Sequence, residues 1–170
     1  RFTADDKGHG RYITGLATPC NVARITQVPL PSQELVPMLW GMRPAIEEDV
    51  QCSSLSWSDE GHYVAMLGHG SDLAHELHLA PHPDDWNKPW AQQRVRLVGA
   101  IAWRAKHLVY RVTLKDHRPT STAPALVDPD GLSPDVPPSG PSVVVDVPYA
   151  LHVEVPDRHS DVVLKYQDAF

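Results

Sequence analysis

Histidine is the residue type in this chain that is best suited to chemistry at neutral pH. The chain has ten histidines, and His69, His75, His78 and His82 lie close together. If residues 71–79 formed a helix, His75 and His78 would share one face, as two zinc ligands do. In a strand, these two side chains would point to opposite faces. The spacing is also one residue shorter than in the zinc-binding His-Glu-x-x-His motif, so loop and interface histidines are the favoured interpretation.

The last of these histidines begins the segment His-Pro-Asp-Asp, residues 82–85, which follows Pro81. This segment resembles the zinc-binding motif of the PIG-L-type N-acetylglucosamine deacetylases. The resemblance implies that His82 and one aspartate bind zinc and that the other aspartate acts as a base. The chain departs from that family at residues 86–89, where the family has a glutamate and a glycine-rich turn, and it has no later His-x-x-His pair.

Other catalytic motifs are missing from the sequence. There is no Gly-x-Ser-x-Gly nucleophile elbow and no glycine-rich phosphate-binding loop. We therefore predict no catalytic residue, no metal ligand and no cofactor, and we interpret the chain as non-enzymatic. A metal-dependent hydrolase that uses the region His69–His82 is the third function that we consider.

The composition is that of one ordinary globular domain. Of the 170 residues, 42% are hydrophobic and 21% are charged, and the 17 prolines disfavour long helices. The net charge of −6 disfavours a general attraction to nucleic acid. The cationic residues of segment 94–111 allow a small nucleic-acid contact, but we favour their interpretation as surface and interface cations. No apolar run approaches the roughly 20 residues of a membrane span, so we expect no membrane contact.

Cys20 and Cys52 are the two cysteines of the chain. Two cysteines are too few for a secreted disulfide framework, and their spacing does not match a Cys-x-x-Cys metal or redox site. We expect both to be small, buried hydrophobic side chains.

Prolines divide the chain into short segments, most of which alternate apolar and polar residues as half-buried strands do. Residues 51–57 and 62–67 predict a hairpin, because the Ser-Asp-Glu-Gly between them favours a turn. The clearest strand spans residues 108–114, where every second side chain is apolar on one face. Further strands are expected at residues 21–28, 142–147 and 151–155.

Two short helices are expected. Residues 71–78 begin with Ser-Asp, either of which can cap a helix. Residues 90–103 place valine, leucine, isoleucine and alanine on one broad helical face, although Gly99 lowers the helix propensity there.

Seven of the 17 prolines lie in residues 118–141, among serine, threonine, aspartate and glycine. Proline has no backbone N–H to donate, so this stretch is predicted as a long, extended surface loop. No repeat or second domain is visible. The pattern as a whole predicts an all-β sandwich or barrel, in a single domain of residues 1–170, with one or two short helices.

Segment 94–114 resembles a feature of picornavirus-like capsid proteins. In that family a short helix leads through a Trp-Arg-Gly turn into a strand of the form Leu-x-Tyr-x-Val. Here Trp-Arg-Ala at residues 103–105 matches the turn, and residues 108–112 match the strand. Residues 143–150, which contain Val-Pro-Tyr, resemble a later strand of the same family. Two further segments agree with the family in order, residues 21–28 and 76–81.

The resemblance implies an antiparallel β-sandwich of jelly-roll type, and the Pro-rich loop at residues 118–141 departs from that family because it takes the place of a further strand. It implies a structural subunit of a viral capsid, located in the virion and assembled in the host cytoplasm. The implied partners are other capsid subunits, which would be contacted through loops and strand edges. We expect little or no direct nucleic-acid binding, because the N-terminus has no basic arm.

Large aromatic side chains and one arginine are the interface candidates for such a subunit. They are Trp86, Trp90, Trp103, Arg104 and Tyr149, and Trp40 and Trp57 offer further anchors. The second function that we consider is a small acidic β-sandwich that acts as a binding or immunity-type module.

Overall fold

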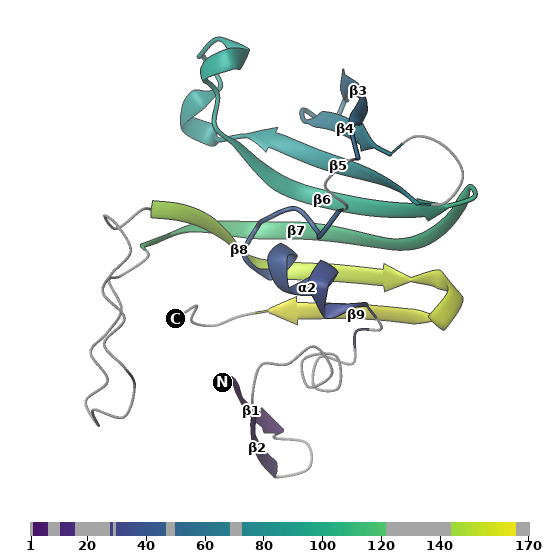
Figure 1. The fold of residues 1–170 in the computed structure, drawn as a ribbon. Coiled ribbons are helices and arrows are strands. Elements are labelled where there is room, and N and C mark those ends of the chain that lie inside the picture. Colours follow the sequence, from purple (N-terminus) through teal and green to yellow (C-terminus); the bar gives the residue numbers. More distant parts are fainter. Residues whose placement is uncertain are drawn as a thin grey trace.

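The computed structural model describes residues 2–6, 11–15, 28, 30–46, 50–68, 73–121 and 144–165. Most of the described residues belong to one antiparallel sheet of seven strands, in which each strand pairs with its neighbours in sequence (Figure 1). The strands are β3 (Cys52–Trp57), β4 (Tyr63–Leu67), β5 (Ala74–Pro81), β6 (Val95–Arg104), β7 (His107–Ser121), β8 (Val144–Val155) and β9 (Ser160–Lys165).

The remaining elements are short. A separate hairpin is formed by β1 (Phe2–Asp6) and β2 (Arg11–Gly15). The α-helix of the described residues is α2 (Ser32–Leu39), and three single turns of 3-10 helix are η1 (Pro83–Asp85), η2 (Trp90–Gln92) and η3 (Pro156–Arg158). No helix in the described ranges is long and apolar enough to cross a membrane.

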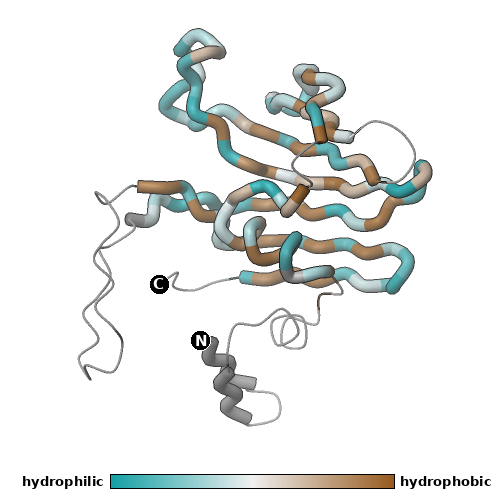
Figure 2. Tube along the Cα trace, viewed as in Figure 1, coloured by the Kyte–Doolittle hydropathy of each residue, from teal (hydrophilic) through white to brown (hydrophobic). Residues whose placement is uncertain are grey.

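The seven-stranded sheet has one face covered by α2 and the residues before it, and one face that is open except at β6, where Gly99 and Ile101 are buried. Leu77, Ala100, Val112 and Val153 lie side by side across β5 to β8 on the covered face. These residues form one buried core with Val28, Leu30 and the α2 residues Leu35 and Met38. Figure 2 shows hydrophobic residues concentrated along the central strands, and α2 lies against β8.

In each strand, the residue adjacent to the covered one points to the other face. His78, Gly99, Thr113 and His152 lie side by side there, in register across the same four strands. Charged pairs run over this face, including Arg111 Nη1 with Glu154 Oε2 at 3.3 Å. The period of two along the strands therefore separates an apolar layer from a polar one.

The alternation of residue types predicted several strands correctly. The hairpin expected at residues 51–57 and 62–67 is β3 and β4, and the strand expected at residues 108–114 lies within β7. Residues 144–147 and 151–155, from two expected strands, belong to the single strand β8, which continues through Pro148, and residues 142–143 lie outside the described ranges. Within the described residues, β8 pairs with β9 only from Ala150 onward, so the missing N–H of Pro148 falls where one side of the strand is unpaired.

The predicted helix at residues 90–103 was wrong. Only residues 90–92 are helical, as η2, and the rest is the central strand β6. Both faces of β6 are buried from Gly99 to Ala102, so its apolar run lacks the polar alternation that marks a strand. Gly99 suits a strand here because a Cβ atom would meet His78 Cβ at 3.3 Å and the Val112 carbonyl oxygen at 3.4 Å.

The predicted helix at residues 71–78 was also wrong in its described part, because β5 begins at Ala74. The structure instead has α2, where Leu35 and Met38 fall on one face at i and i+3. The proline-rich surroundings, including Pro37 inside the helix, concealed this pattern.

Of three further predictions, the one for Cys52 was wrong and the other two fall largely outside the described residues. Cys52 is exposed rather than buried, because it lies on the edge strand β3, and Cys20 lies outside the described residues. The strand expected at residues 21–28 also lies outside them, except for Val28, which is buried but not in a strand.

The predicted loop at residues 118–141 begins later than expected. Residues 118–121 continue β7 and pair with residues 144–147 of β8, including Pro119 opposite Asp146. Residues 122–141 lie outside the described ranges. The fold is thus mostly β, with one open antiparallel sheet and one short helix among the described residues, and they do not show the two packed sheets of a jelly roll.

The covered face predicts the effect of removing a core side chain. Substitution Leu35→Ala should lower the free energy of unfolding by about 2–5 kcal/mol, because it leaves a cavity between α2 and the sheet. The exposed Val163 on β9 is the matched control, and Val163→Ala should change the free energy of unfolding by less than about 0.5 kcal/mol. Urea denaturation measures both, and equal losses in the two variants would contradict this account of the core.

Candidate functional site

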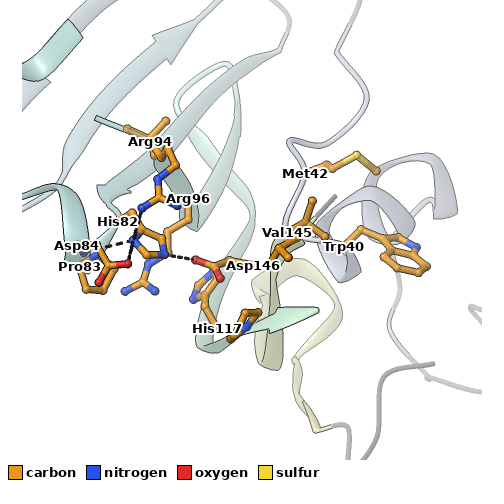
Figure 3. Close-up of a pocket in the computed structure, with 14 residues that line it drawn as sticks. Trp40, Met42, His82, Pro83, Asp84, Arg94, Arg96, His117, Val145 and Asp146 are labelled. Atoms are coloured by element: carbon orange, nitrogen blue, oxygen red, sulfur yellow. Dashed lines mark hydrogen bonds and ion pairs between the residues drawn. The ribbon is translucent and has the colours of Figure 1, made fainter. Parts of the chain in front are cut away.

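A cavity of about 630 Å³ lies at one end of the sheet. It is bounded by the residues that follow α2, by the connection from β5 to β6, and by the paired ends of β7 and β8. One side of its lining is polar and the other is apolar, as Figure 3 shows. The polar residues include His82, Arg94, Arg96, His117 and Asp146, and the apolar residues include Trp40, Met42, Val95, Val144 and Val145.

Asp85 fixes the polar wall of the cavity. Its carboxylate is completely buried and accepts hydrogen bonds from Arg94 Nε at 2.7 Å and from the Arg94 backbone N–H at 3.0 Å. Lys88 Nζ forms an ion pair with the other carboxylate oxygen. The hydrogen bonds from Arg94, followed by that from Lys88, hold the pKa of Asp85 well below its usual range. Asp85 therefore stays ionised, and its bonds to Arg94 and Lys88 hold together the segment that connects β5 to β6.

His82 joins this connection to β8. Its Nδ1 accepts a hydrogen bond from the backbone N–H of Asp84 at 3.2 Å, and Arg94 Nη2 also lies 3.2 Å away. Two donors at Nδ1 place the ring proton on Nε2, which lies 3.1 Å from Asp146 Oδ2. Both nitrogens of His82 are engaged, so the residue acts here as a structural link.

The engagement of His82 and Asp85 bears on the zinc site implied by the deacetylase resemblance. Asp85 is surrounded by Arg94 and Lys88, and His82 has no nitrogen left for a metal in this arrangement. In the described part of the chain, no group of three or more His, Cys, Asp or Glu side chains is placed to hold a metal ion.

The other histidines of the segment point to different parts of the molecule, as the strand alternative predicted. His75 is buried on the covered face, with its ring 6.5 Å from that of Tyr110. Burial lowers the pKa of His75, and its Nε2 has no hydrogen-bond partner. His78 lies on the open face, and His69 falls outside the described residues.

A second cavity, of about 540 Å³, lies on the open face beside His78. The ring of His78 stacks on that of His62, with centroids 4.6 Å apart, and His78 Nε2 lies 2.7 Å from Glu76 Oε1. Burial, followed by the neighbouring His78, lowers the pKa of His62. Arg111 and Lys115 also line this cavity, which is therefore polar with charges of both signs.

Arg96 lines the first cavity, and from the sequence it was interpreted only as one of several surface cations in segment 94–111. It makes no hydrogen bond or ion pair with the part of the chain that the structure describes, and its Nε atom is enclosed. The neighbouring His117 donates from Nε2 to the Leu97 carbonyl at 2.8 Å. Burial lowers the pKa of His117, so its ring is neutral at neutral pH.

The structure separates the interface candidates. Trp86 lies beside Trp57, with ring centroids 6.2 Å apart at a right angle, and Trp57 packs edge-on against Tyr63 at 4.7 Å. Trp90 in η2 is strongly exposed. Trp103 and Arg104 lie at the far end of β6, while Tyr149 on β8 lies beneath the Arg118 guanidinium at 4.3 Å.

Comparisons with protein-family models, curated proteins and solved structures found no match to this chain. Any assignment of function therefore depends on the residues and geometry described above.

The buried carboxylate predicts a specific loss of stability in acid. The pKa of Asp85 in the folded protein lies below the value of about 3.9 in an unfolded chain, so its stabilising effect is complete above about pH 5 and declines as the pH falls below that. Asp85→Asn should lower the melting temperature at pH 7 and flatten its decline between pH 5 and pH 3.

The exposed neighbour Asp84 provides the matched control. Asp84→Asn should keep both the melting temperature and the acid decline of the natural protein, as measured by circular dichroism. If Asp85→Asn and the natural protein lost stability in parallel over this pH range, the proposed role of Asp85 would be wrong.

Proposed function

We propose that this protein is a non-enzymatic subunit that assembles with other protein chains, and that the assembly is a viral capsid. The observation that carries the proposal is the unprotected edge of the sheet at β3. The picornavirus-like resemblance of residues 103–112 and 143–150 supports the capsid as the particular assembly, with the virion as its location and the host cytoplasm as the place of assembly. Residues 95–104 form the strand β6 and not the short helix of that family, so this part of the resemblance gives no support.

The two edges of the sheet differ in how they are protected. All six residues of β3 are exposed, and its sequence Cys-Ser-Ser-Leu-Ser-Trp contains no charge and no proline. The opposite edge, β9, carries Asp161 and Lys165. Charges on an edge strand discourage pairing with other chains, whereas a neutral edge offers its free N–H and C=O groups to another strand. A strand of another chain can therefore pair with the backbone of β3.

Apolar anchors lie beside this edge. Leu55 on β3 is 62% exposed, Trp57 is 51% exposed, and Trp86 is 52% exposed. Exposed aromatic side chains that pack on one another are typical anchors of protein interfaces. The edge of β3 and this cluster would bind a partner together, the first through backbone hydrogen bonds and the second through burial of apolar surface.

The partner that we propose at β3 is a second copy of the chain. An uncharged strand can pair with its own copy in antiparallel orientation across a two-fold axis without meeting a like charge. Pairing at β3 supports a dimer only. The jelly-roll sandwich and the complete capsid shell are proposed on the resemblance alone.

A small acidic binding module is the second candidate function. The observation that favours it is the cavity lined by Val145 and Arg96, since a binding module needs one concave patch rather than several interfaces. The oligomeric state distinguishes the two candidates, because the module would be a monomer in solution.

The assembly proposal predicts the effect of a charge on β3. The natural protein should form dimers or larger species, and Leu55→Lys should weaken this association at least about tenfold, because two ammonium groups would meet across the two-fold axis. Light scattering coupled to size-exclusion chromatography measures the mass over a range of concentrations.

Val163→Lys places the same charge on the edge strand β9, at a residue that is 57% exposed, and should leave the association unchanged. A natural protein that stays a monomer at every concentration would overturn the assembly proposal. Equal weakening by the two lysine variants would show that β3 is not the contact.

A further inference from the structure

We propose that the cavity between α2 and the ends of β7 and β8 binds a small organic monocarboxylate, with its carboxylate at Arg96 and its apolar body against Val145 and Met42. This site is separate from the β3 edge, so the inference does not rest on the proposed assembly. It is carried by the state of the Arg96 guanidinium and by the two-sided lining of the cavity.

The other polar groups of the cavity wall already have partners. Arg94 is held by the buried Asp85, His82 lies 3.1 Å from Asp146, and His117 donates to the Leu97 carbonyl. Among the described residues, Arg96 differs from Arg94 because no carboxylate lies within ion-pair distance of it. The cavity therefore contains one guanidinium that is ready to receive an anion.

The environment of Arg96 makes such an anion favourable. Its Nε atom is enclosed and has lost contact with water without gaining an acceptor, which is a costly state for a charged donor. A carboxylate at the two Nη atoms would supply the missing negative charge, and guanidinium–carboxylate pairs form strong, charge-assisted hydrogen bonds. Arg96 thus determines the chemical class of the head group.

The charges nearby favour one negative charge over two. Asp84 and Asp146 also line the cavity, and Asp146 lies close enough to His117 to influence its ring. A phosphate dianion would be repelled by these carboxylates, whereas a monocarboxylate matches the single unpaired guanidinium. The polar wall therefore selects a monoanion.

The other wall defines the body of the ligand. Met42, Val144 and Val145 are exposed apolar side chains that line the same cavity. Figure 3 shows Val145 and Met42 on the opposite side of the view from His82 and Arg96, with Asp146 between the two groups. A volume of about 630 Å³ falls in the range of small-molecule sites, so a ligand with an apolar ring system fits.

The turn after α2 holds this apolar wall in place. Gly41 has a φ of +72°, and a Cβ atom there would approach both the Asp146 carbonyl oxygen and Pro148 Cδ to 3.1 Å. This close approach places Trp40 and Met42 against the start of β8. The cavity is thus formed by close backbone packing between two elements that are distant in the sequence.

Three probes with one apolar body and different head groups test the proposal. They are 2-naphthoate, the uncharged 2-naphthylmethanol and the dianionic 2-naphthyl phosphate, titrated against the full chain and followed by naphthalene fluorescence anisotropy. The natural protein should bind 2-naphthoate most tightly. Arg96→Gln should weaken the binding of 2-naphthoate about tenfold and leave the binding of 2-naphthylmethanol unchanged.

Arg104 at the opposite end of β6 is the matched control, and Arg104→Gln should bind all three probes as the natural protein does. If Arg96→Gln does not fold, as judged by near-ultraviolet circular dichroism, Val145→Glu gives an independent test. It places a carboxylate at an exposed position of the same wall and should weaken the binding of 2-naphthoate.

Three results would overturn the inference. The first is equal binding of 2-naphthoate by the natural protein and by folded Arg96→Gln, or by Val145→Glu where that variant decides. The second is binding of 2-naphthylmethanol as tight as that of 2-naphthoate, which would mean that no cation recognises the head group. The third is tighter binding of 2-naphthyl phosphate, which would exclude the preference for a monoanion.

Discussion

An open antiparallel sheet must bury one of its faces, and the rest of this structure depends on that requirement. The strands β3 to β9 form a single layer, and α2 and the residues before it provide the apolar cover. Leu35 and Met38 meet the side chains of β5 to β8 on one face, and the other face carries paired charges and histidines. Among the described strands the sheet does not close on itself, so β3 and β9 are its two edges, and of these two strands β9 carries charged side chains.

The segment that follows α2 also forms one wall of the cavity. The chain leaves α2 through Gly41, whose backbone packs against β8, and this contact places apolar side chains opposite the polar connection between β5 and β6. Asp85 holds that connection by binding Arg94 and Lys88, and His82 ties it to Asp146. Among the described cations of the lining, Arg96 alone has no carboxylate partner. The proposed binding of an anion at Arg96 depends on this, because the nearby carboxylates are already paired with other groups.

Residue patterns predicted the strands whose two faces differ and failed where they do not. The strand at residues 108–114 alternates because one of its faces packs into the core and the other is only partly covered. The β3–β4 hairpin was predicted from the turn residues between its strands. The central strand β6 is buried on both faces, so its apolar run matched a helix equally well. Helix α2 was missed because Pro37 interrupts a segment in which only two side chains, Leu35 and Met38, carry the packing.

The sequence by itself determined that the described part of the chain is mostly β and that His75 and His78 diverge if they lie in a strand. It predicted short strands bounded by prolines, whereas β7 and β8 are long and continue through Pro119 and Pro148. The tertiary structure decided which strands share a sheet, which edge is left neutral, and that His82 meets Asp146 across a long separation in sequence. The reason is physical, since strand patterns are local, whereas the pairing of charges depends on which side chains the sheet and α2 bring within hydrogen-bond distance. Arg96 resembles every other arginine in the sequence, and only its neighbours in space make it a candidate for binding.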